Sequence, residues 1–251
     1  MDRSYIILNE NNNLVSQRIK PKLALIHTHL SGSKIFLSAD GMETIFVDVN
    51  EDLSNNKRIE FELWKQPTAG ALCGEAINKW LSDFIDSPVK LVKFIDNVHP
   101  FRLSSVENEG KFENDSTLPI RYQDADPIML INSASIADLN SRIAAKNFQT
   151  THVNFRPNIH AQLNKAYEED HVKLWTIGNV TFEKIKECSR CTFPTVNPET
   201  GIKHPDSEPL ATLKTYRMFE GYDTPILGVQ LLPLQNGTIK LGDFIEERKL
   251  Q

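Results

Sequence analysis

Short runs of β-branched and aromatic residues, separated by turn-forming residues, dominate the first hundred positions of the sequence. Such runs are typical of the strands of an antiparallel sheet or barrel. The runs that we expect to form strands are Tyr5–Leu8, Leu23–His29, Ser33–Ser38, Glu43–Val49, Arg58–Trp64 and Val89–Ile95. Apolar residues within 73–85 recur instead at helical spacing, which predicts one amphipathic helix packed on the sheet.

A second region follows a polar stretch at residues 107–117, which is typical of a loop or a domain boundary. After it, Pro127–Ile131 predicts a buried strand that leads into a helix, with Ser135 and Asp138 as a capping box at its start. The later elements that we expect are strands at Asn154–Ile159, Lys173–Ile177 and Val180–Ile185, a helix at Glu208–Arg217, and a hairpin in which Asn236-Gly237 joins Leu231–Leu234 to Ile239–Leu241. The pattern predicts an α+β protein that is mainly β, a barrel decorated by a few helices.

The charge balance argues against several classes of partner. The chain has 28 basic and 33 acidic residues and an isoelectric point near 5.8, so no general attraction to nucleic acid or to an anionic membrane surface is expected. The longest apolar stretch, Ile226–Leu234, is too short and too interrupted to span a bilayer. The first eight residues resemble a strand more than a targeting leader. Three cysteines do not suggest a disulfide framework, which favours a reducing compartment or one facing the cytosol.

The sharpest local motif is Cys188-Ser189-Arg190-Cys191 at the end of a predicted strand. A zinc site would need two more ligands, and the third cysteine, Cys73, is far away in the sequence. A redox pair should open a helix that lowers the thiol pKa, whereas prolines and a glycine follow within ten residues. Two small buried residues at a strand end are the plainest alternative. Taken by itself, the motif leaves these alternatives open.

Arginines form a second local signal. Arg156 lies beside Pro157 with Asn158 just beyond, about thirty residues before Arg190. If both arginines lie at one end of the sheet, their planar guanidinium groups can hold a phosphate in bidentate fashion. The alternative for either arginine is a surface ion pair with a carboxylate.

Several segments, taken in order, resemble MOSC-domain proteins, and most of all the amidoxime-reducing members of that family. The segments are 122–127, 135–142, 154–159, 188–201, 208–210 with 216–217, and 237–243, while residues 1–95 resemble the N-terminal β-barrel region of the family. The resemblance implies a MOSC-type β-barrel with decorating helices in residues 99–249, and a partial N-terminal β-barrel region in residues 1–98. Family members carry a membrane anchor, a first strand and further cofactor contacts ahead of this point. We expect no counterpart here, because Met1 directly precedes the equivalent of the second strand, and the loss would leave a barrel edge unpaired.

The same resemblance implies a function. Such proteins reduce N-hydroxylated compounds, amidoximes among them, at a molybdenum cofactor (molybdenum-molybdopterin), and they receive electrons from NADH through a flavin reductase and a b-type cytochrome. They reside on the outer mitochondrial membrane and face the cytosol. Two alternatives belong to other classes: a carrier of the cofactor or of sulfur without turnover, and an inactive shortened form that acts only through protein contacts.

The site residues follow from the same resemblance, position by position. Cys191 is the metal ligand and catalytic thiolate, and Cys188 is a packing residue. The positions that match cofactor contacts in the family are Arg3, Asp124, Ala125, Asp126, Arg156, Asn158, Ser189 and Arg190. Asp124 is also the candidate proton donor or substrate-orienting carboxylate. Gln230 stands where the family tends to have a tyrosine near the cofactor.

Overall fold

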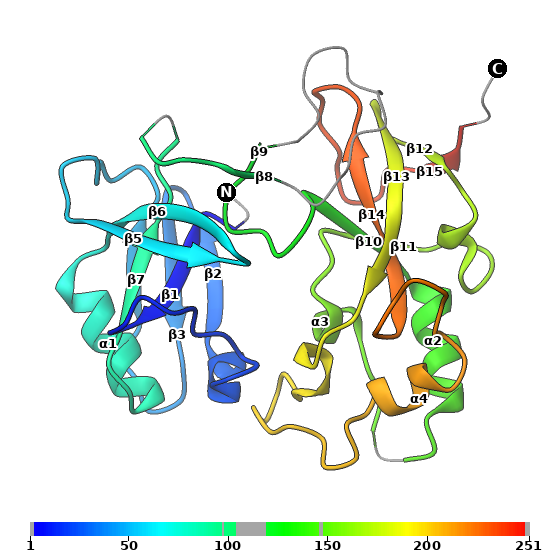
Figure 1. Ribbon diagram of the computed structural model, residues 1–251, viewed down its shortest axis with the longest axis horizontal. Coiled ribbons are helices and arrows are strands. Elements are labelled where there is room, and N and C mark those ends of the chain that lie inside the picture. Colours follow the sequence, from blue (N-terminus) through cyan, green and yellow to red (C-terminus); the bar gives the residue numbers. More distant parts are fainter. Residues whose placement is uncertain (1–2, 97, 104–118, 146–147, 249–251) are drawn as a thin grey trace. The chain divides into compact units, whose positions relative to one another are not determined.

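The structure is a computed structural model that describes residues 3–96, 98–103, 119–145 and 148–248 (Figure 1). The chain divides into two compact units. The first unit comprises Met1–Ala125 with Val196–Ile202, and the second comprises Asp126–Thr195 with Lys203–Gln251. The predicted division into residues 1–98 and 99–249 stays a prediction. The polar stretch 107–117 lies outside the described residues.

The first unit is built on a four-stranded antiparallel sheet in the order β1-β7-β6-β5. The strands are β1 (Tyr5–Asn9), β5 (Arg58–Leu63), β6 (Gln66–Leu72) and β7 (Val89–Lys93). Burial alternates strictly along β5, so one face is covered and the other faces water. Helix α1 (Glu75–Ile85) packs beside β7 and buries its five apolar residues, as the helical spacing predicts (Figure 1).

A second, three-stranded sheet in this unit has the order β2-β3-β4. Its strands are β2 (His27–Ser31), β3 (Lys34–Ser38) and β4 (Ile45–Asp48). The expected strand Leu23–His29 is wrong in its first half, where a 3-10 helix, η1 (Pro21–Leu25), precedes β2. Pro21 explains the difference, because its fixed φ suits the first turn of a helix. Sequence analysis also missed β6, whose Pro67 and Gly70 resemble turn residues.

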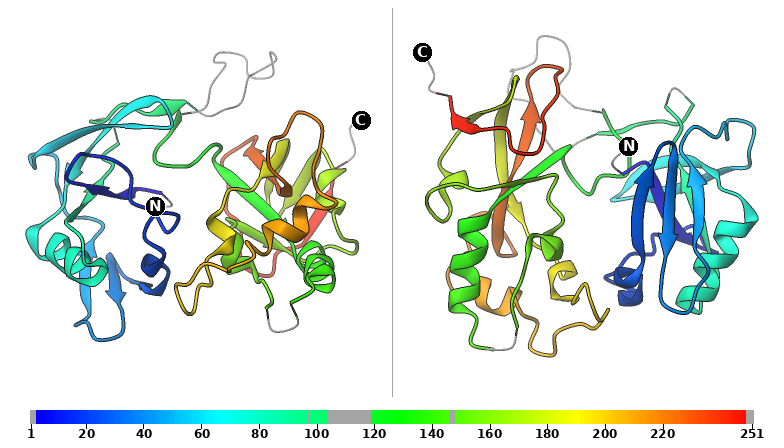
Figure 2. Two further views of the ribbon diagram at one scale, coloured as in Figure 1. Left: turned by 60° about the horizontal axis from the view of Figure 1, so that its bottom comes forward. Right: turned by 180° about the vertical axis from the view of Figure 1, so that it is seen from behind.

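The second unit contains a six-stranded sheet in the order β11-β10-β14-β13-β12-β15 (Figures 1 and 2). Its strands are β10 (Ile128–Asn132), β11 (Ile159–Ala161), β12 (Leu174–Ile177), β13 (Val180–Ser189), β14 (Ile226–Pro233) and β15 (Ile245–Glu247). Two helices, α2 (Ser133–Arg142) and α4 (Leu210–Lys214), lie side by side. The shorter elements of the chain are β8 (Arg102–Leu103), β9 (Pro119–Ile120), α3 (His152–Phe155), η2 (Glu168–Asp170) and η3 (Phe193–Thr195). The mainly β architecture with a few helices is therefore confirmed.

Helix α2 does not begin with the predicted capping box. Its N-cap is Asn132, whose side-chain oxygen accepts a hydrogen bond from the amide of Ala134 at 3.0 Å. Ser135 is fully buried one turn inside, and its hydroxyl donates to Glu169 at 2.7 Å. Asp138 is paired with Arg142 at 2.7 Å. Asn132 is itself an efficient N-cap, which moves the helix start three residues earlier than the sequence pattern predicts.

One expected strand and one expected hairpin are also wrong. Residues expected as a strand at Asn154–Ile159 form the end of α3, then a left-handed residue, Arg156 (φ 50°), and only the start of β11. The expected hairpin at Asn236-Gly237 does not form, because the chain beyond it bonds elsewhere. Thr238 donates to the side chain of Asn179 in the β12–β13 turn at 3.1 Å, and β15 then pairs with β12.

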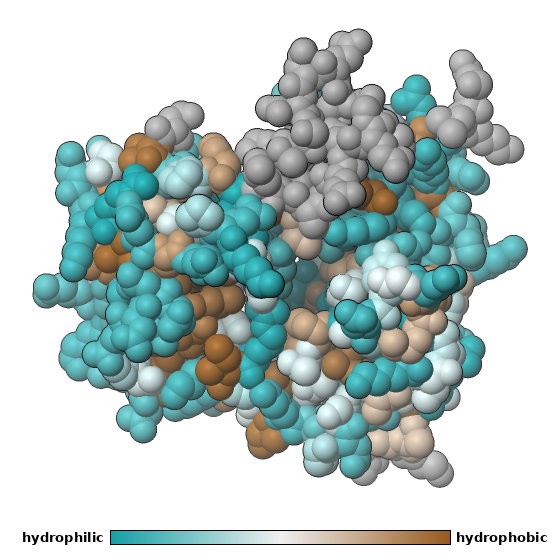
Figure 3. Space-filling model, viewed as in Figure 1, coloured by the Kyte–Doolittle hydropathy of each residue, from teal (hydrophilic) through white to brown (hydrophobic). Residues whose placement is uncertain are grey.

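Each unit has its own apolar core. Figure 3 shows that the visible surface is mostly hydrophilic with smaller hydrophobic patches, as the charged content of 24% would lead one to expect. Among the described residues, no helix has the length and apolar character needed to cross a membrane. In the second unit one core cluster includes Met129, Phe155 and Cys188. The end of β13 therefore rests directly on this core.

Candidate functional site

The cysteine motif lies where β13 ends, and the alternation of the strand decides which side chains are accessible. Cys188 and Arg190 are both 7% exposed, whereas Ser189 and Cys191 face outward. Pairing with the neighbouring chain continues past the strand, since the amide of Arg190 donates to the carbonyl oxygen of Pro225 at 2.8 Å. The motif therefore presents one thiol to the outside and keeps the other inside. The element directly after it is the short 3-10 helix η3 and not an α-helix, in agreement with the prolines there.

Arg190 extends its guanidinium group into the second unit. Nη2 donates to the carbonyl oxygen of Phe155 at 2.9 Å, and Nη1 lies 3.0 Å from the Sγ of Cys188 and 3.2 Å from the Sδ of Met129. The guanidinium carbon also lies 5.3 Å from the centre of the Phe155 ring. Its Nε is buried and has no hydrogen-bond partner among the described residues. A buried donor on a cation is costly to leave unpaired, so Nε is a candidate contact for a bound group.

Cys188 accepts two hydrogen bonds in addition to packing in the core. Its Sγ accepts from Arg190 and also from Nε2 of Gln230 at 3.2 Å. Gln230 reaches it from β14, the strand beside β13. The Oε1 of Gln230 is buried and lacks a partner among the described residues. Sequence analysis could not find this contact, because it depends on the register between two strands.

Arg156 and Asn158 flank a proline directly after α3. Arg156 is exposed, adopts φ 50° and ends the helix by donating its amide to the carbonyl oxygen of His152 at 2.9 Å. Its guanidinium carbon lies 5.3 Å from the ring centre of Phe193, two residues beyond Cys191. Asn158 fixes the start of β10, because its Oδ1 accepts from the amide of Met129 at 2.9 Å.

The two arginines of the predicted phosphate clamp are linked through the backbone. Arg190 donates to Phe155, the residue immediately before Arg156. The structure thus brings the end of β13 and the end of α3 together. Ser189 and Cys191 lie at the same end of β13. Whether these residues touch a cofactor stays a prediction.

Asp126 is one of the predicted cofactor contacts. Its side chain is fully buried, and its Oδ2 lies 3.1 Å from Nζ of Lys186 on β13. Lys186 was not a candidate from the sequence. A buried carboxylate that is paired with a lysine is held in place, which favours a positioning role over proton transfer.

Three predicted site residues belong to the first unit: Arg3, Asp124 and Ala125. Arg3 is half-buried with φ 53°. Asp124 is exposed, and its Oδ2 lies 3.6 Å from Nη1 of Arg18. Arg102 holds the preceding turn by donating to the carbonyl oxygen of Gln123 at 2.6 Å. Burial lowers the pKa of Arg102, and Asp124 partly offsets this effect.

The donor set decides what kind of group the site can hold. Among the residues that the structure describes, no three or more histidine, cysteine or acidic side chains cluster as a metal site. A molybdenum cofactor brings its own sulfur ligands, so one protein thiolate is enough. Cys191 supplies an accessible thiol, and the buried Nε of Arg190 and Oε1 of Gln230 offer one unsatisfied donor and one unsatisfied acceptor. The residues present therefore fit that group.

Comparison with known proteins decides the family. The model of the MOSC domain matches residues 117–246, and that of the MOSC N-terminal beta barrel domain matches residues 1–88. The chain belongs to the MOSC-domain family. This MOSC-domain chain is 32% identical over 246 residues to mitochondrial amidoxime-reducing component 1 of Danio rerio, which covers 96% of the chain and 73% of that protein.

Two further relatives of this MOSC-domain protein give the same result. Mitochondrial amidoxime-reducing component 1 of Homo sapiens is 33% identical over 250 residues, which covers 96% of the chain and 71% of that protein. Mitochondrial amidoxime reducing component 2 of Bos taurus is 31% identical over 249 residues, with the same 96% and 71% coverage. The resemblance noted in the sequence is thereby confirmed.

Proposed function

We propose that this MOSC-domain protein reduces N-hydroxylated compounds, amidoximes among them, at a molybdenum cofactor. The observation that supports the proposal most directly is the end of β13, where an exposed Cys191 follows the buried Arg190 with its unpaired Nε. The names of the relatives point to the same activity. Reduction of an amidoxime consumes two electrons and two protons and yields an amidine and water.

Different residues of the second unit bind different parts of the cofactor. Cys191 is the metal ligand, because a soft thiolate suits molybdenum. Ser189, Asn158 and Gln230 contact the cofactor, and Arg156 with Arg190 binds its phosphate, where planar guanidinium groups are effective. When bound, the cofactor supplies the exchange of two electrons with the substrate.

The residues of the first unit complete the assignment. Arg3 contributes to binding the phosphate. Asp124 donates a proton or orients the substrate, a role that its exposed carboxylate permits. Ala125 of the first unit and Asp126 of the second are cofactor contacts in this proposal, and Lys186 of the second unit holds Asp126 in position through their 3.1 Å ion pair.

The electron supply and the location are proposed from the family resemblance. We propose that electrons come from NADH through a flavin reductase and a b-type cytochrome. We also propose a place on the outer mitochondrial membrane, facing the cytosol. The net charge of −5 is compatible with docking to a small haem protein.

The test uses protein purified from a host that makes the molybdenum cofactor. Molybdenum and released pterin are measured in the wild type, in Cys191→Ser, and in Cys73→Ala as a matched control that removes a buried thiol from the first unit. We expect metal in the wild type and in Cys73→Ala, and its loss in Cys191→Ser. Amidoxime reduction with the donor chain supplied should follow the metal content.

Other results would overturn parts of the proposal. Equal activity in Cys191→Ser would mean that another residue is the ligand. Molybdenum without turnover would favour the carrier, and protein without molybdenum would favour a form that acts only through protein contacts.

A further inference from the structure

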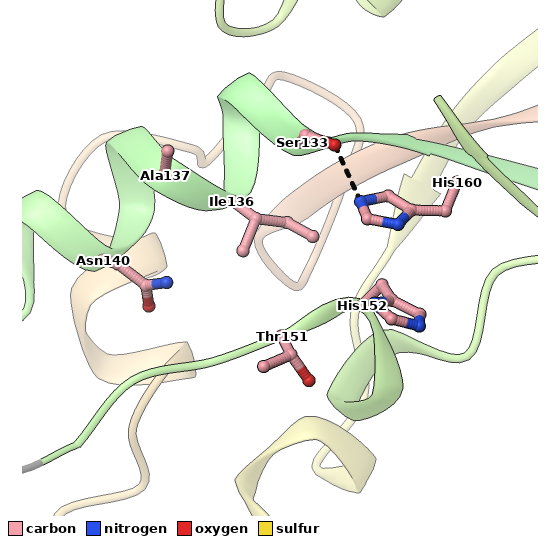
Figure 4. A pocket seen from close by; sticks show the side chains of 7 residues that line it. All are labelled: Ser133, Ile136, Ala137, Asn140, Thr151, His152 and His160. Carbon is pink, nitrogen blue, oxygen red and sulfur yellow. Dashed lines mark hydrogen bonds between the residues drawn. The ribbon is translucent and has the colours of Figure 1, made fainter. Parts of the chain in front are cut away.

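A cavity of about 210 Å³ lies in the second unit, away from the end of β13 in sequence (Figure 4). It is lined by Ser133, Ile136, Ala137, Asn140, Thr151, His152 and His160. The residues come from α2, from the start of α3 and from β11. Its lining contains two imidazoles and no carboxylate, which makes it chemically distinct from the site described above.

The walls of this cavity are held rigidly. Asn140 on α2 exchanges hydrogen bonds with the backbone of Thr150, as donor to its carbonyl oxygen and acceptor from its amide, both at 2.8 Å. Thr151 and Asn154 form a capping box at the start of α3. His160 is opposite Ile131 in the parallel pairing of β11 with β10. The backbones that carry both histidines are therefore fixed in place.

The hydrogen bonds of Ser133 determine which nitrogen of His160 is free. The hydroxyl of Ser133 donates to the carbonyl oxygen of Ala161 at 3.1 Å, and its oxygen lies 2.9 Å from Nε2 of His160 (Figure 4). When the single hydroxyl hydrogen is directed to Ala161, Nε2 of His160 donates to Ser133. This leaves Nδ1 of His160 unprotonated. Histidines that ligate metals are oriented in this way, with the second ring nitrogen donating to an oxygen.

His152 provides the second imidazole. Its ring centre lies 4.5 Å from that of His160, with 18° between the planes. We propose that His152 and His160 together bind a divalent transition-metal ion of the class Zn²⁺, Cu²⁺ or Ni²⁺. Imidazole nitrogen is a preferred ligand of these ions. Mg²⁺ and Ca²⁺ prefer carboxylate oxygens instead, and no carboxylate lines this cavity.

Binding requires one movement. Nearly parallel rings direct their lone pairs along parallel lines, so one ring must turn for both to meet the same ion. Both rings are exposed, but that of His160 is held by Ser133, so His152 is the ring that turns while its backbone stays capped. Water fills the remaining coordination positions, since the described residues contain no third histidine, cysteine or carboxylate that completes a metal cluster there. The ion therefore binds reversibly, without the closed four-ligand shell of a structural zinc site.

The position of the two histidines gives the ion a structural effect. They bracket residues 153–159, the segment that carries Arg156 and Asn158. An ion held by both rings links the start of α3 to β11 and restrains this segment. The inference stands apart from the proposed function, since the site uses none of the residues assigned to the cofactor.

The test is a titration of the full-length, chelator-treated protein with ZnCl₂, followed by calorimetry, and with CuCl₂, followed by the visible spectrum of the bound ion. All variants are made in a His27→Ala/His29→Ala background, because these two exposed residues lie two positions apart on β2 and can themselves chelate. The variants are His152→Ala, His160→Ala and Ser133→Ala. Thermal unfolding of each checks that it folds.

We expect one ion per chain in the background protein, with affinity at least about tenfold lower in either histidine variant. Ser133→Ala should weaken binding less than removal of a histidine. The copper spectrum should report nitrogen ligands and lose this signature in His160→Ala. Absence of binding in the background protein, or binding that is unchanged in folded His152→Ala or His160→Ala, would overturn the proposal.

Discussion

Nη1 of Arg190 lies 3.0 Å from Sγ of Cys188, and both side chains are buried. The sulfur also accepts from Gln230, so one thiol serves a donor from its own strand and a donor from the next. Thiol sulfur is a weak acceptor, but few other acceptors surround this guanidinium: the Sδ of Met129 and the carbonyl oxygen of Phe155. Cys188 thus fixes the direction of Arg190 beside Cys191.

Replacing Cys188 tests this role. Cys188→Ala leaves Nε2 of Gln230 without its acceptor and weakens the hold on Arg190, so the free energy of unfolding should fall by about 1–3 kcal/mol. Cys188→Ser keeps an acceptor at the same position and should lose less. Urea denaturation of both variants measures the difference. Equal loss in the two would mean that the sulfur only fills volume.

Removing one partner of the buried ion pair of Arg217 and Asp170 should destabilise the second unit more strongly than the loss of Cys188. Their Nη2 and Oδ2 atoms lie 2.6 Å apart, and the side chains are 6% and 5% exposed. Asp170→Ala leaves a buried cation unpaired, which should cost about 3–5 kcal/mol in denaturant unfolding. The double variant Asp170→Ala/Arg217→Met removes both charges and should recover part of the loss. A double variant no more stable than the single one would contradict this account.

Glu169 makes stability depend on pH. Burial raises the pKa of its carboxyl group above the ordinary value, although Ser135 and Asn132 donate hydrogen bonds to it. The folded protein therefore binds this proton more tightly than the unfolded chain, and the contribution of Glu169 falls as pH rises from the ordinary value near 4.5 through the raised pKa. Glu169→Gln should lose less stability over that interval. Unfolding midpoints from pH 4 to pH 8 measure the two curves, and parallel curves would contradict the prediction.

Gly228 on β14 cannot accept a side chain. Its φ is +77°, and a Cβ atom there would lie 2.6 Å from the carbonyl oxygen of Leu130 on β10. Gly41 is a matched control, with φ +76° and no atom within 4 Å of such a Cβ. Gly41→Ala should cost only the backbone strain, about 1–2 kcal/mol. Gly228→Ala should cost clearly more in thermal and denaturant unfolding, because strand β14 must also move away from β10. Similar losses in the two variants would show that the close approach is unimportant.

Patterns that depend on neighbouring residues predicted the fold well. Helix α1 follows from the spacing of Ile77, Trp80 and Phe84, and β13 from its run of β-branched and aromatic residues. The failures occur where a contact with a distant segment decides the structure. Asn132, not Ser135, is the N-cap, because the hydroxyl of Ser135 is buried and donates to Glu169. Asn179 diverts the chain at Thr238 away from the expected hairpin.

The candidate site shows the same division. The order of segments along the chain makes Cys191 and the arginines candidates, and that resemblance needs no three-dimensional information. The contacts of Gln230 with Cys188 and of Lys186 with Asp126 depend on how neighbouring strands and loops meet. A strand pattern shows which side chains share a face, but it does not reveal their partners on the next strand.

Side chains alternate between the two faces of a strand, so the number of residues along β13 determines which of the two thiols, Cys188 or Cys191, is exposed to solvent. The pairing of this strand with β14 shifts register twice, between Lys184 and Lys186 and between Glu187 and Ser189. Deleting one residue from the regularly paired stretch Phe182–Lys184, away from these bulges, would turn the side chains that follow to the opposite face of the sheet. Cys188 would then point outward, and Cys191 would be driven into the apolar interior. A change of length in this single strand would therefore exchange the exposed thiol for the buried one without altering any residue of the cysteine motif.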